Sequence, residues 1–468
     1  MRLFESLLLI LLLLQLFWPA LAGHRPRVGL ALPVAALLLF AIHGLWEGLR
    51  WQMIPAYVLL AITGLLALGA YLRGGPARRR RWPTILAFVL GLPLWLLAVA
   101  LPWALPVPGL PAPTGPYLVG TVSYHLIDEN RPETYSPDPD DARQFMAQLW
   151  YPAASIDGAV AAPYIDHVEI AAPILAESFG FPRFLFNHLN LARTDGYLAA
   201  PPAADGPFPV LVFAHGLTGF RGQNGFQMQE LASQGYVVAA IDHTYGSRFA
   251  IFPDGTVVEY DAEVAFPPGV DDAGNRLVQT WAGDISYLLD QMEMWTAGAT
   301  EPGEVDWTGR LDLDHLGLFG HSTGGGTALE VCGHDERCDA ALGLDAWVEP
   351  VSDDVRAAGL SQPLLFLSAP DWISESNQQT GEAFYAASAA DRYLLTVAGS
   401  DHFDFTDFPD FSPLTPYLGV AVTDQGAITQ AAVQAYTLAF FNHYLRGTDE
   451  PLLTGPSPRF PTLTFRHD

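Results

Sequence analysis

Four long apolar stretches occupy the first 106 residues of this 468-residue chain, at 6–22, 28–46, 53–72 and 84–105. A helix needs about 20 mostly apolar residues to cross the hydrocarbon core of a bilayer. The last three stretches reach or nearly reach that length, and the first is shorter. The pattern therefore predicts an all-α transmembrane region of about four spans over residues 1–106.

The arginines predict how this region is oriented. Of the nine arginines among residues 1–106, seven lie at 23–27 and 73–82, which four spans would place on one side, and two lie on the other. Cytoplasmic loops carry the excess of Lys and Arg. We therefore expect a multi-pass protein of the cytoplasmic (plasma) membrane, with the large C-terminal domain outside the cytoplasm. The alternative is cleavage after Ala22, which ends a signal-peptidase-like Ala-Leu-Ala and would leave three spans.

The apolar stretches are predicted to anchor the chain and nothing more. They contain no acidic residue, and His43 is the one ionisable group well inside a span. A transport or proton path would carry more such groups. Residues 107–116 are rich in proline and predict a short, stiff linker to a third region at 117–468.

The remainder of the chain is strongly acidic. Residues 107–468 hold 14 Arg and 48 acidic residues, a formal charge of −34, and the whole chain contains no lysine. Nucleic-acid binding needs clustered cations, so nucleic acid is excluded as a partner. Protein partners stay unknown from the sequence.

Two cysteines, Cys332 and Cys338, are the only ones in the chain. They lack the second pair that a zinc site needs, so no metal is expected there. In an oxidising compartment they would form a small disulfide, and two unpaired thiols are the alternative.

From residue 117 onward, short apolar runs alternate with stretches of helical periodicity. Strands are predicted at 117–127, 144–151, 209–214, 236–241, 315–319, 340–344, 363–368 and 392–397, and helices at 225–234, 276–295, from 322 and at 427–445. Strands buried on both faces and alternating with helices are typical of a mostly parallel sheet covered on both sides. Such α/β sheets bind ligands at the carboxyl ends of their strands.

A Gly-His-Ser-Thr-Gly motif at 320–324 lies between a predicted strand and a predicted helix. In this context the glycines permit a sharp turn that lifts the serine hydroxyl above the sheet edge. Ser322 is therefore the candidate nucleophile. The two amide donors that a developing oxyanion needs are expected from Thr323, directly after the nucleophile, and from Leu217, in the turn after the first parallel strand.

A serine nucleophile needs a base and an orienting acid, which follow it in the order acid, then histidine, in this kind of fold. His402 follows the last predicted strand and is the candidate base, because His443 lies in a helix and His467 is expected at a frayed chain end. Two aspartates are candidates for the acid. Asp345 ends the strand after the nucleophile's helix, and Asp371 follows the next strand, which the pattern alone slightly favours. Asp401 is adjacent to His402 and is set aside.

Five blocks of the sequence resemble the platelet-activating factor acetylhydrolase family, a branch of the α/β-hydrolase superfamily. They are AHGLTGFRGQ at 214–223, VVAAIDH at 237–243, GHSTGGGTAL at 320–329, LGLDAW at 342–347 and GSDHFDFTDF at 399–408. The family carries its acid in the LDAW block, so the resemblance selects Asp345 over Asp371. It also implies an α/β-hydrolase fold, a calcium-independent reaction without cofactor, and short or oxidised acyl esters of phospholipids as substrates.

Two departures from the family stand out. Its secreted animal members lack an N-terminal membrane region, and Thr323 stands where they carry Phe, which changes the shape expected for the acyl pocket. Residues 164–200 contain apolar runs that predict either a lid over the site or ordinary core packing. Three functions remain in competition. The first is a phospholipid deacylase, the second is a broad esterase (a carboxylesterase, lipase or polyester hydrolase), and the third is a catalytically silent binding module.

Overall fold

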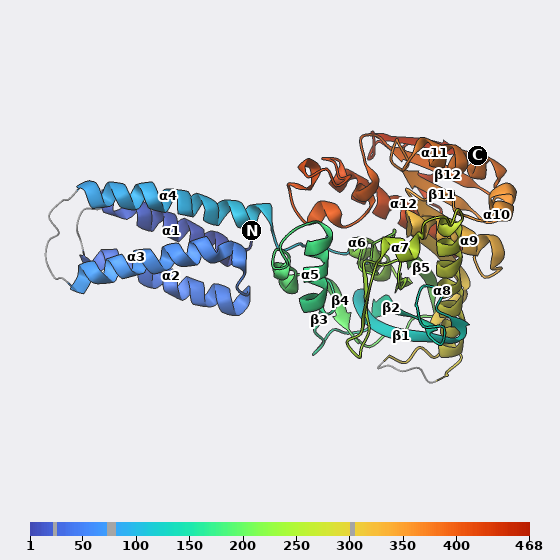
Figure 1. Cartoon of the computed structure of the whole chain (residues 1–468), viewed down its shortest axis with the longest axis horizontal. Coiled ribbons are helices and arrows are strands. Elements are labelled where there is room, and N and C mark those ends of the chain that lie inside the picture. Colours follow the sequence, from blue (N-terminus) through green and yellow to red (C-terminus); the bar gives the residue numbers. More distant parts are fainter. Residues whose placement is uncertain (22–25, 73–80, 300–304) are drawn as a thin grey trace. The chain divides into compact units, whose positions relative to one another are not determined.

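A computed structural model describes residues 1–21, 26–72, 81–299 and 305–468. The chain forms two compact units (Figure 1). The first, here called the helical unit, comprises Met1–Pro108 together with two later segments, Pro182–Ala192 and Phe411–Leu414. The second, here called the sheet unit, comprises the remaining ranges Gly109–Phe181, Arg193–Asp410 and Thr415–Asp468.

Four helices form the body of the helical unit: α1 (Leu3–Leu21), α2 (Pro26–Trp46), α3 (Ile54–Leu72) and α4 (Arg81–Ala104). Leucines such as Leu8 and Leu12 are buried between them, while others, including Leu38 and Leu65, are more than 60% exposed. By length and composition, Trp51–Gly69 is the one described helix that could cross a membrane, and the three other helices have shorter apolar parts. The prediction of four spans is therefore not confirmed. Most of the arginines on which the orientation depends, at 25, 73 and 78–80, and Ala22 with its predicted cleavage site, lie outside the described residues.

One end of the helical unit contains a buried ion network. Glu5 is fully buried, and the guanidinium of Arg50 donates two hydrogen bonds to its carboxylate, at 2.7 and 2.8 Å. Arg2 also pairs with Glu5 at 2.7 Å, and His43 contacts Glu47 at 2.9 Å. The apolar pattern placed Glu5 outside the first stretch, whereas α1 includes it. Its burial depends on Arg50, since an unpaired buried carboxylate would be strongly unfavourable.

The sheet unit is built on an 11-stranded sheet in the order β13-β12-β11-β10-β9-β5-β6-β2-β1-β4-β3. The strands are β1 (Leu118–Pro132), β2 (Ala142–Ala153), β3 (Ala161–Pro163), β4 (Arg193–Leu198), β5 (Phe208–Ala214), β6 (Val237–Asp242), β9 (Leu311–His321), β10 (Ala340–Leu344), β11 (Leu364–Ser368), β12 (Arg392–Val397) and β13 (Leu463–His467). From β6 through β5, β9, β10 and β11 to β12 every pairing is parallel. The predicted α/β architecture is confirmed.

Helices cover both faces of this sheet (Figure 1). The side chains of α8 (Ala273–Thr296), α9 (Thr323–His334) and α11 (Glu375–Ala387) join one hydrophobic core. Those of α6 (Gly225–Ser233) and α12 (Gly426–Arg446) join a second core on the opposite face. Because β5, β9 and β10 are buried on both sides, their carboxyl ends are held rigidly at one edge, where the candidate residues follow.

Two expectations about single residues are settled by the fold. His467 was expected at a frayed end, which is wrong: it ends β13, pairs antiparallel with β12, and stacks on the ring of Tyr393 at 4.2 Å. Cys332 and Cys338 form a disulfide with a Cα–Cα distance of 5.1 Å.

The segment at 164–200, predicted to be a lid or part of the core, contains one helix, α5 (Val168–Ser178), and a short 3-10 turn, η2 (Asn187–Leu191).

Candidate active site

Ser322 occupies a strained turn between β9 and α9. Its backbone angles are φ 54° and ψ −119°, a region that non-glycine residues avoid and that is found at functional turns. A methyl group added to Gly324 would lie 2.0 Å from the carbonyl oxygen of Ala214, and one added to Gly320 would lie 2.3 Å from the backbone of Gly324. The two glycines therefore allow the turn to pack against the end of β5. The serine side chain stands at the sheet edge, nearly buried.

Asp345 and His402 are in direct contact. Asp345 directly follows β10, is fully buried and accepts a hydrogen bond from Nδ1 of His402 at 2.6 Å through Oδ2. Its other oxygen accepts the backbone N–H of Ala369 at 2.9 Å. Since Nδ1 of His402 donates to a carboxylate, Nε2 is the ring atom left to take a proton from a nucleophile.

The two other aspartates considered for the acid lie elsewhere. Asp371 is exposed at the surface beyond β11. Asp401 accepts the backbone N–H of His402 at 2.7 Å, so its carboxylate caps the turn and does not orient the ring. The structure thus brings Asp345 to His402, the pairing that the family resemblance implied.

The serine turn and the His402 loop touch through the residue before the nucleophile. The rings of His321 and His402 have centroids 4.4 Å apart, and Nε2 of His321 donates to the backbone oxygen of His402 at 2.9 Å. Within these described residues, no hydrogen bond joins Ser322 Oγ to the ring of His402. Such catalytic hydrogen bonds are often long before substrate binds.

The turn at 215–219 leaves one amide free beside the serine. The N–H of Gly216 donates to Oε1 of Gln223 at 3.2 Å, that of Thr218 to Gly246 O at 2.8 Å, and that of Gly219 to Gly216 O at 2.8 Å. Among the described residues, neither the N–H of Leu217 nor that of Thr323 has an acceptor. A Cβ placed on Gly216 would lie 3.3 Å from Cβ of Ser322, so this turn adjoins the serine.

Behind this turn lies a buried polar chain that sequence reasoning missed. His215 donates through Nδ1 to Gly216 O at 2.7 Å and accepts the N–H of His243 at 3.2 Å. Burial lowers the pKa of His215 to about 3, so it stays neutral. His243 contacts Asp284 at 3.0 Å, and Arg143 holds both oxygens of Asp284 at 2.9 and 2.6 Å. Burial alone would raise the pKa of Asp284, yet Arg143 and His243 hold it well below its usual range. The blocks at 214–223, which contains His215, and at 237–243, which ends in His243, were the signals in the sequence.

One group of metal-type ligands occurs among the described residues, formed by Glu5, His43 and Glu47 in the helical unit. Arg50 and Arg2 already neutralise Glu5, and both ring nitrogens of His43 have partners, Glu47 and Tyr57. These side chains are therefore fully engaged without an ion. The expectation that the protein uses no cofactor remains a prediction.

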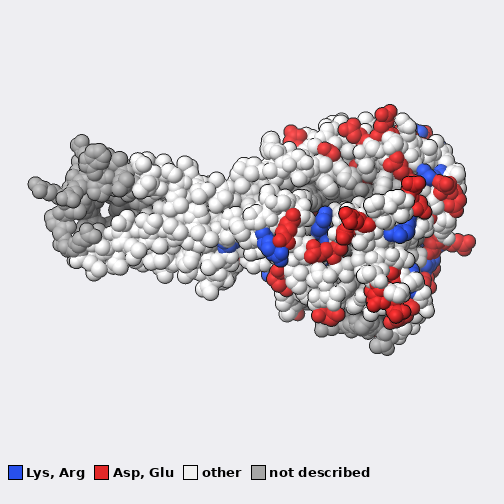
Figure 2. All heavy atoms as spheres, in the orientation of Figure 1, with Lys and Arg blue, Asp and Glu red and all other residues white. Residues whose placement is uncertain are grey.

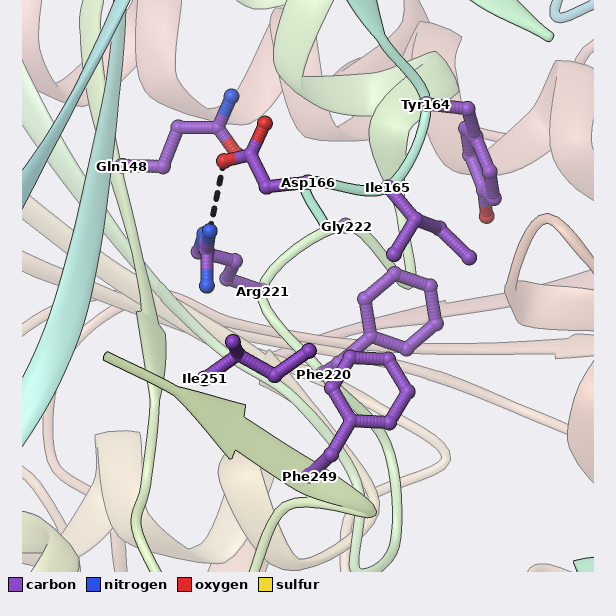
Figure 3. Close-up of a pocket in the computed structure, with 9 residues that line it drawn as sticks. All are labelled: Gln148, Tyr164, Ile165, Asp166, Phe220, Arg221, Gly222, Phe249 and Ile251. Carbon is purple, nitrogen blue, oxygen red and sulfur yellow. Dashed lines mark hydrogen bonds and ion pairs between the residues drawn. The ribbon is translucent and has the colours of Figure 1, made fainter. Parts of the chain in front are cut away.

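The sheet unit also contains a small cavity, which the candidate catalytic residues do not line. Figure 3 shows the ion pair of Arg221 with Asp166 on one side of it and the rings of Phe220 and Phe249 on the other. Its volume of about 10 Å³ holds roughly one water molecule. It does not include Ser322, Asp345 or His402, and it is too small for an ester.

Three comparisons relate this arrangement to known proteins. The family model described as platelet-activating factor acetylhydrolase, isoform II, matches residues 106–253 and 305–448. The platelet-activating factor acetylhydrolase of Cavia porcellus is 27% identical over 321 residues, covering 64% of this chain and 69% of that protein. The bis(hydroxyethyl) terephthalate hydrolase of Streptomyces coelicolor is 27% identical over 202 residues, covering 43% of this chain and 52% of that protein. The solved structure of a ferulic acid esterase from Streptomyces cinnamoneus matches with a TM-score of 0.62 and 30% identity, over 76% of this chain and 98% of that one.

Proposed function

Because the chain belongs to the platelet-activating factor acetylhydrolase family and is a carboxylic ester hydrolase, we propose that Ser322, His402 and Asp345 are its catalytic triad. The observation that carries the proposal is the buried Asp345–His402 contact at 2.6 Å beside the strained serine turn. The free amides of Leu217 and Thr323 are proposed as the oxyanion donors.

In the proposed reaction, His402 Nε2 takes the proton of Ser322 Oγ as that oxygen attacks the ester carbonyl carbon. The carbonyl oxygen gains a negative charge, which the two amides stabilise. The carbon–oxygen bond to the alcohol then breaks, and the alcohol leaves with the proton from His402. Water repeats the sequence on the acyl-enzyme and releases the acid. Asp345 holds the ring in the tautomer that this cycle needs and stabilises the imidazolium that forms.

The central test is Ser322→Ala in the full chain. We expect hydrolysis of a short-chain nitrophenyl ester to fall at least about 10⁴-fold, with no loss of thermal stability beyond that of a Ser388→Ala control. Ser388 is buried in the same unit, and its hydroxyl bonds to Leu360 and Phe384 and to no residue of the triad among the described residues. A fluorophosphonate should label the parent at Ser322 and leave the variant unlabelled. Unlabelled Ser322 in folded parent protein would instead support a silent binding module.

We propose short or oxidised acyl chains of phospholipids as the substrates. The acetylhydrolase relatives support this class, among them a probable 1-alkyl-2-acetylglycerophosphocholine esterase of Arthroderma benhamiae, 28% identical over 275 residues. The terephthalate hydrolase and the ferulic acid esterase favour a second candidate, a broad esterase or polyester hydrolase. Hydrolysis of short-acyl phosphatidylcholine at a rate comparable to simple esters would support the first, and no phospholipid cleavage would support the second.

We also propose that the helical unit embeds the chain in the cytoplasmic membrane and that the sheet unit lies outside the cytoplasm. The many exposed leucines of the helices support an apolar surrounding. The Cys332–Cys338 disulfide favours an oxidising compartment. Figure 2 shows acidic side chains spread over the sheet unit and a nearly uncharged surface on the helices.

The absence of lysine makes this placement testable, because an amine reagent that cannot cross membranes meets only the N-terminal amine in the parent chain. Arg459→Lys, at an exposed position of the sheet unit, should gain a label in intact cells. Arg79→Lys, in the loop proposed to be cytoplasmic, should gain one only after permeabilisation. The opposite pattern would reverse the proposed orientation.

A further inference from the structure

Gln223 is a fully engaged side chain at the meeting point of three loops of the site. It is 5% exposed and lies just before α6, in the segment that follows the 215–219 turn. Its Oε1 accepts the N–H of Gly216 at 3.2 Å, and its Nε2 lies 3.1 Å from Nδ1 of His321. Its backbone oxygen accepts the N–H of Asp407 at 3.0 Å, in the segment after His402.

The donors and acceptors of this chain of contacts are consistent in only one arrangement. Oε1 of Gln223 must accept, because Gly216 offers an N–H, so Nε2 of Gln223 donates to Nδ1 of His321. Nε2 of His321 then carries its proton and donates to the carbonyl oxygen of His402 at 2.9 Å. His321 is therefore neutral. Burial first, and the nearby His402 second, lower its pKa well below the usual value, which agrees with this assignment.

The contacts join the two halves of the site. Gln223 holds the N–H of the 215–216 peptide, which directly precedes the 216–217 peptide that carries the Leu217 amide, so it fixes the start of that turn. The carbonyl of His402 belongs to the residue whose ring must meet Ser322. We propose that Gln223 is a positioning residue, which through His321 fixes the Leu217 amide and the His402 ring in one common geometry. The proposal rests on the proposed function, since it assigns Gln223 a role in that same reaction.

The test is Gln223→Met, which keeps the size of the side chain and removes its hydrogen bonds to Gly216, His321 and Asn224. Gln229→Met is the matched control, because Gln229 is an equally buried glutamine of α6 whose amide bonds to Pro111 and Asp195 and to neither loop of the site. A misplacement of about 1 Å costs on the order of 10²-fold in rate. We expect kcat of Gln223→Met to fall about 10- to 100-fold below that of Gln229→Met, with KM within about threefold and similar melting temperatures.

A double-mutant cycle separates positioning from general destabilisation. If Gln223 acts through His321, Gln223→Met combined with His321→Phe should lose little more kcat than the worse single variant. Losses that multiply would overturn the proposal, as would a kcat for Gln223→Met within twofold of the control. If Gln223→Met fails to fold, the same loss of kcat is expected for His321→Phe, which breaks the link to the His402 carbonyl and leaves Gln223 in place.

Failure of this inference is distinguishable from failure of the proposed function. Parent protein that neither hydrolyses nitrophenyl acetate nor reacts with a fluorophosphonate at Ser322 would contradict the function itself. An active parent whose rate is insensitive to Gln223→Met would contradict only the positioning role.

Discussion

Asp345 makes two hydrogen bonds that only a carboxylate can make at once. One oxygen accepts from the His402 ring, and the other accepts the Ala369 N–H, which fixes the plane of the carboxylate. An asparagine could satisfy Ala369 with its oxygen, but it would then present N–H₂ to Nδ1 of His402. The ring would respond by placing its proton on Nε2, the atom that must act as base.

Asp345→Asn is therefore expected to lower kcat about 10⁴-fold while the protein stays folded. The matched control is Asp371→Asn, the other aspartate that follows a strand, which should leave kcat unchanged because its side chain is exposed. Steady-state kinetics with a nitrophenyl ester measures both. A large loss for Asp371→Asn and none for Asp345→Asn would reassign the acid.

Asp410 should make stability depend on pH. Burial raises its pKa from 3.8 to about 6, although Gln430 donates a hydrogen bond to it at 3.0 Å. The folded state thus binds this proton more tightly than the unfolded state does. The proton bound by Asp410 therefore favours the folded state below about pH 4, and this stabilisation is lost as the pH rises through 6. Asp410→Asn should raise the free energy of unfolding at pH 8 by roughly 1–3 kcal/mol and have little effect at pH 4. Thermal unfolding at both pH values checks this, and an equal gain at both would contradict it.

Among the elements, α9 is fixed at both ends. Its first residue follows the nucleophile, and its other end carries Cys332, which bonds to Cys338 just before β10. Both cysteines are almost fully buried. The disulfide therefore ties the helix behind the serine to the strand that ends at Asp345.

Loss of this disulfide should reduce stability more than activity. For so short a loop, chain entropy predicts about 2 kcal/mol of stabilisation. We expect dithiothreitol to lower the melting temperature of the parent and not that of a Cys332→Ala/Cys338→Ala variant, while the kcat of both stays near the parental value. A parent that is insensitive to the reductant would contradict a stabilising bond.

The strands and helices of the sheet unit could be predicted because their signals are local. Runs such as 209–214 and 340–344 are apolar throughout, and the glycines at 320 and 324 mark the serine turn. The choice of acid was harder, since Asp345 and Asp371 both follow strands. The family resemblance selected Asp345, and the fold shows that Asp345 meets His402.

Contacts between residues that are far apart in the sequence could not be predicted, because they leave no pattern in the sequence around either residue. Gln223 and His321 are 98 residues apart, and His243 and Asp284 are 41 apart, so nothing in either neighbourhood indicates the partner. The error at His467 has the same origin. The short segment near the chain end is predicted to be frayed, because nothing in its own sequence indicates that it pairs with the edge of β12.

At the scale of the whole molecule, the chain passes between the two units five times. The crossings lie at 108/109, 181/182, 192/193, 410/411 and 414/415. Within the helical unit, Trp51 donates to the carbonyl oxygen of Leu185 at 3.1 Å, and the ring of Trp51 meets that of Phe184 at 5.4 Å. Ser412 donates to the carbonyl oxygen of Ala104 at 2.5 Å. Residues far along the sequence are thus part of the helical unit's own packing.

This interleaving means that one break in the polypeptide would not separate the two units. If a protease site is engineered into the linker at 107–116 and cleaved in detergent, the N-terminal fragment should still co-purify with an affinity tag at the C-terminus. Trp51→Ala combined with Ser412→Ala should weaken that retention. Clean release of an intact sheet unit from the otherwise unaltered protein would show that 182–192 and 411–414 are dispensable to the helices. The helices would then be a unit that the linker alone joins to the hydrolase. The packing described above instead makes two segments of the C-terminal part of the chain integral to the helical unit.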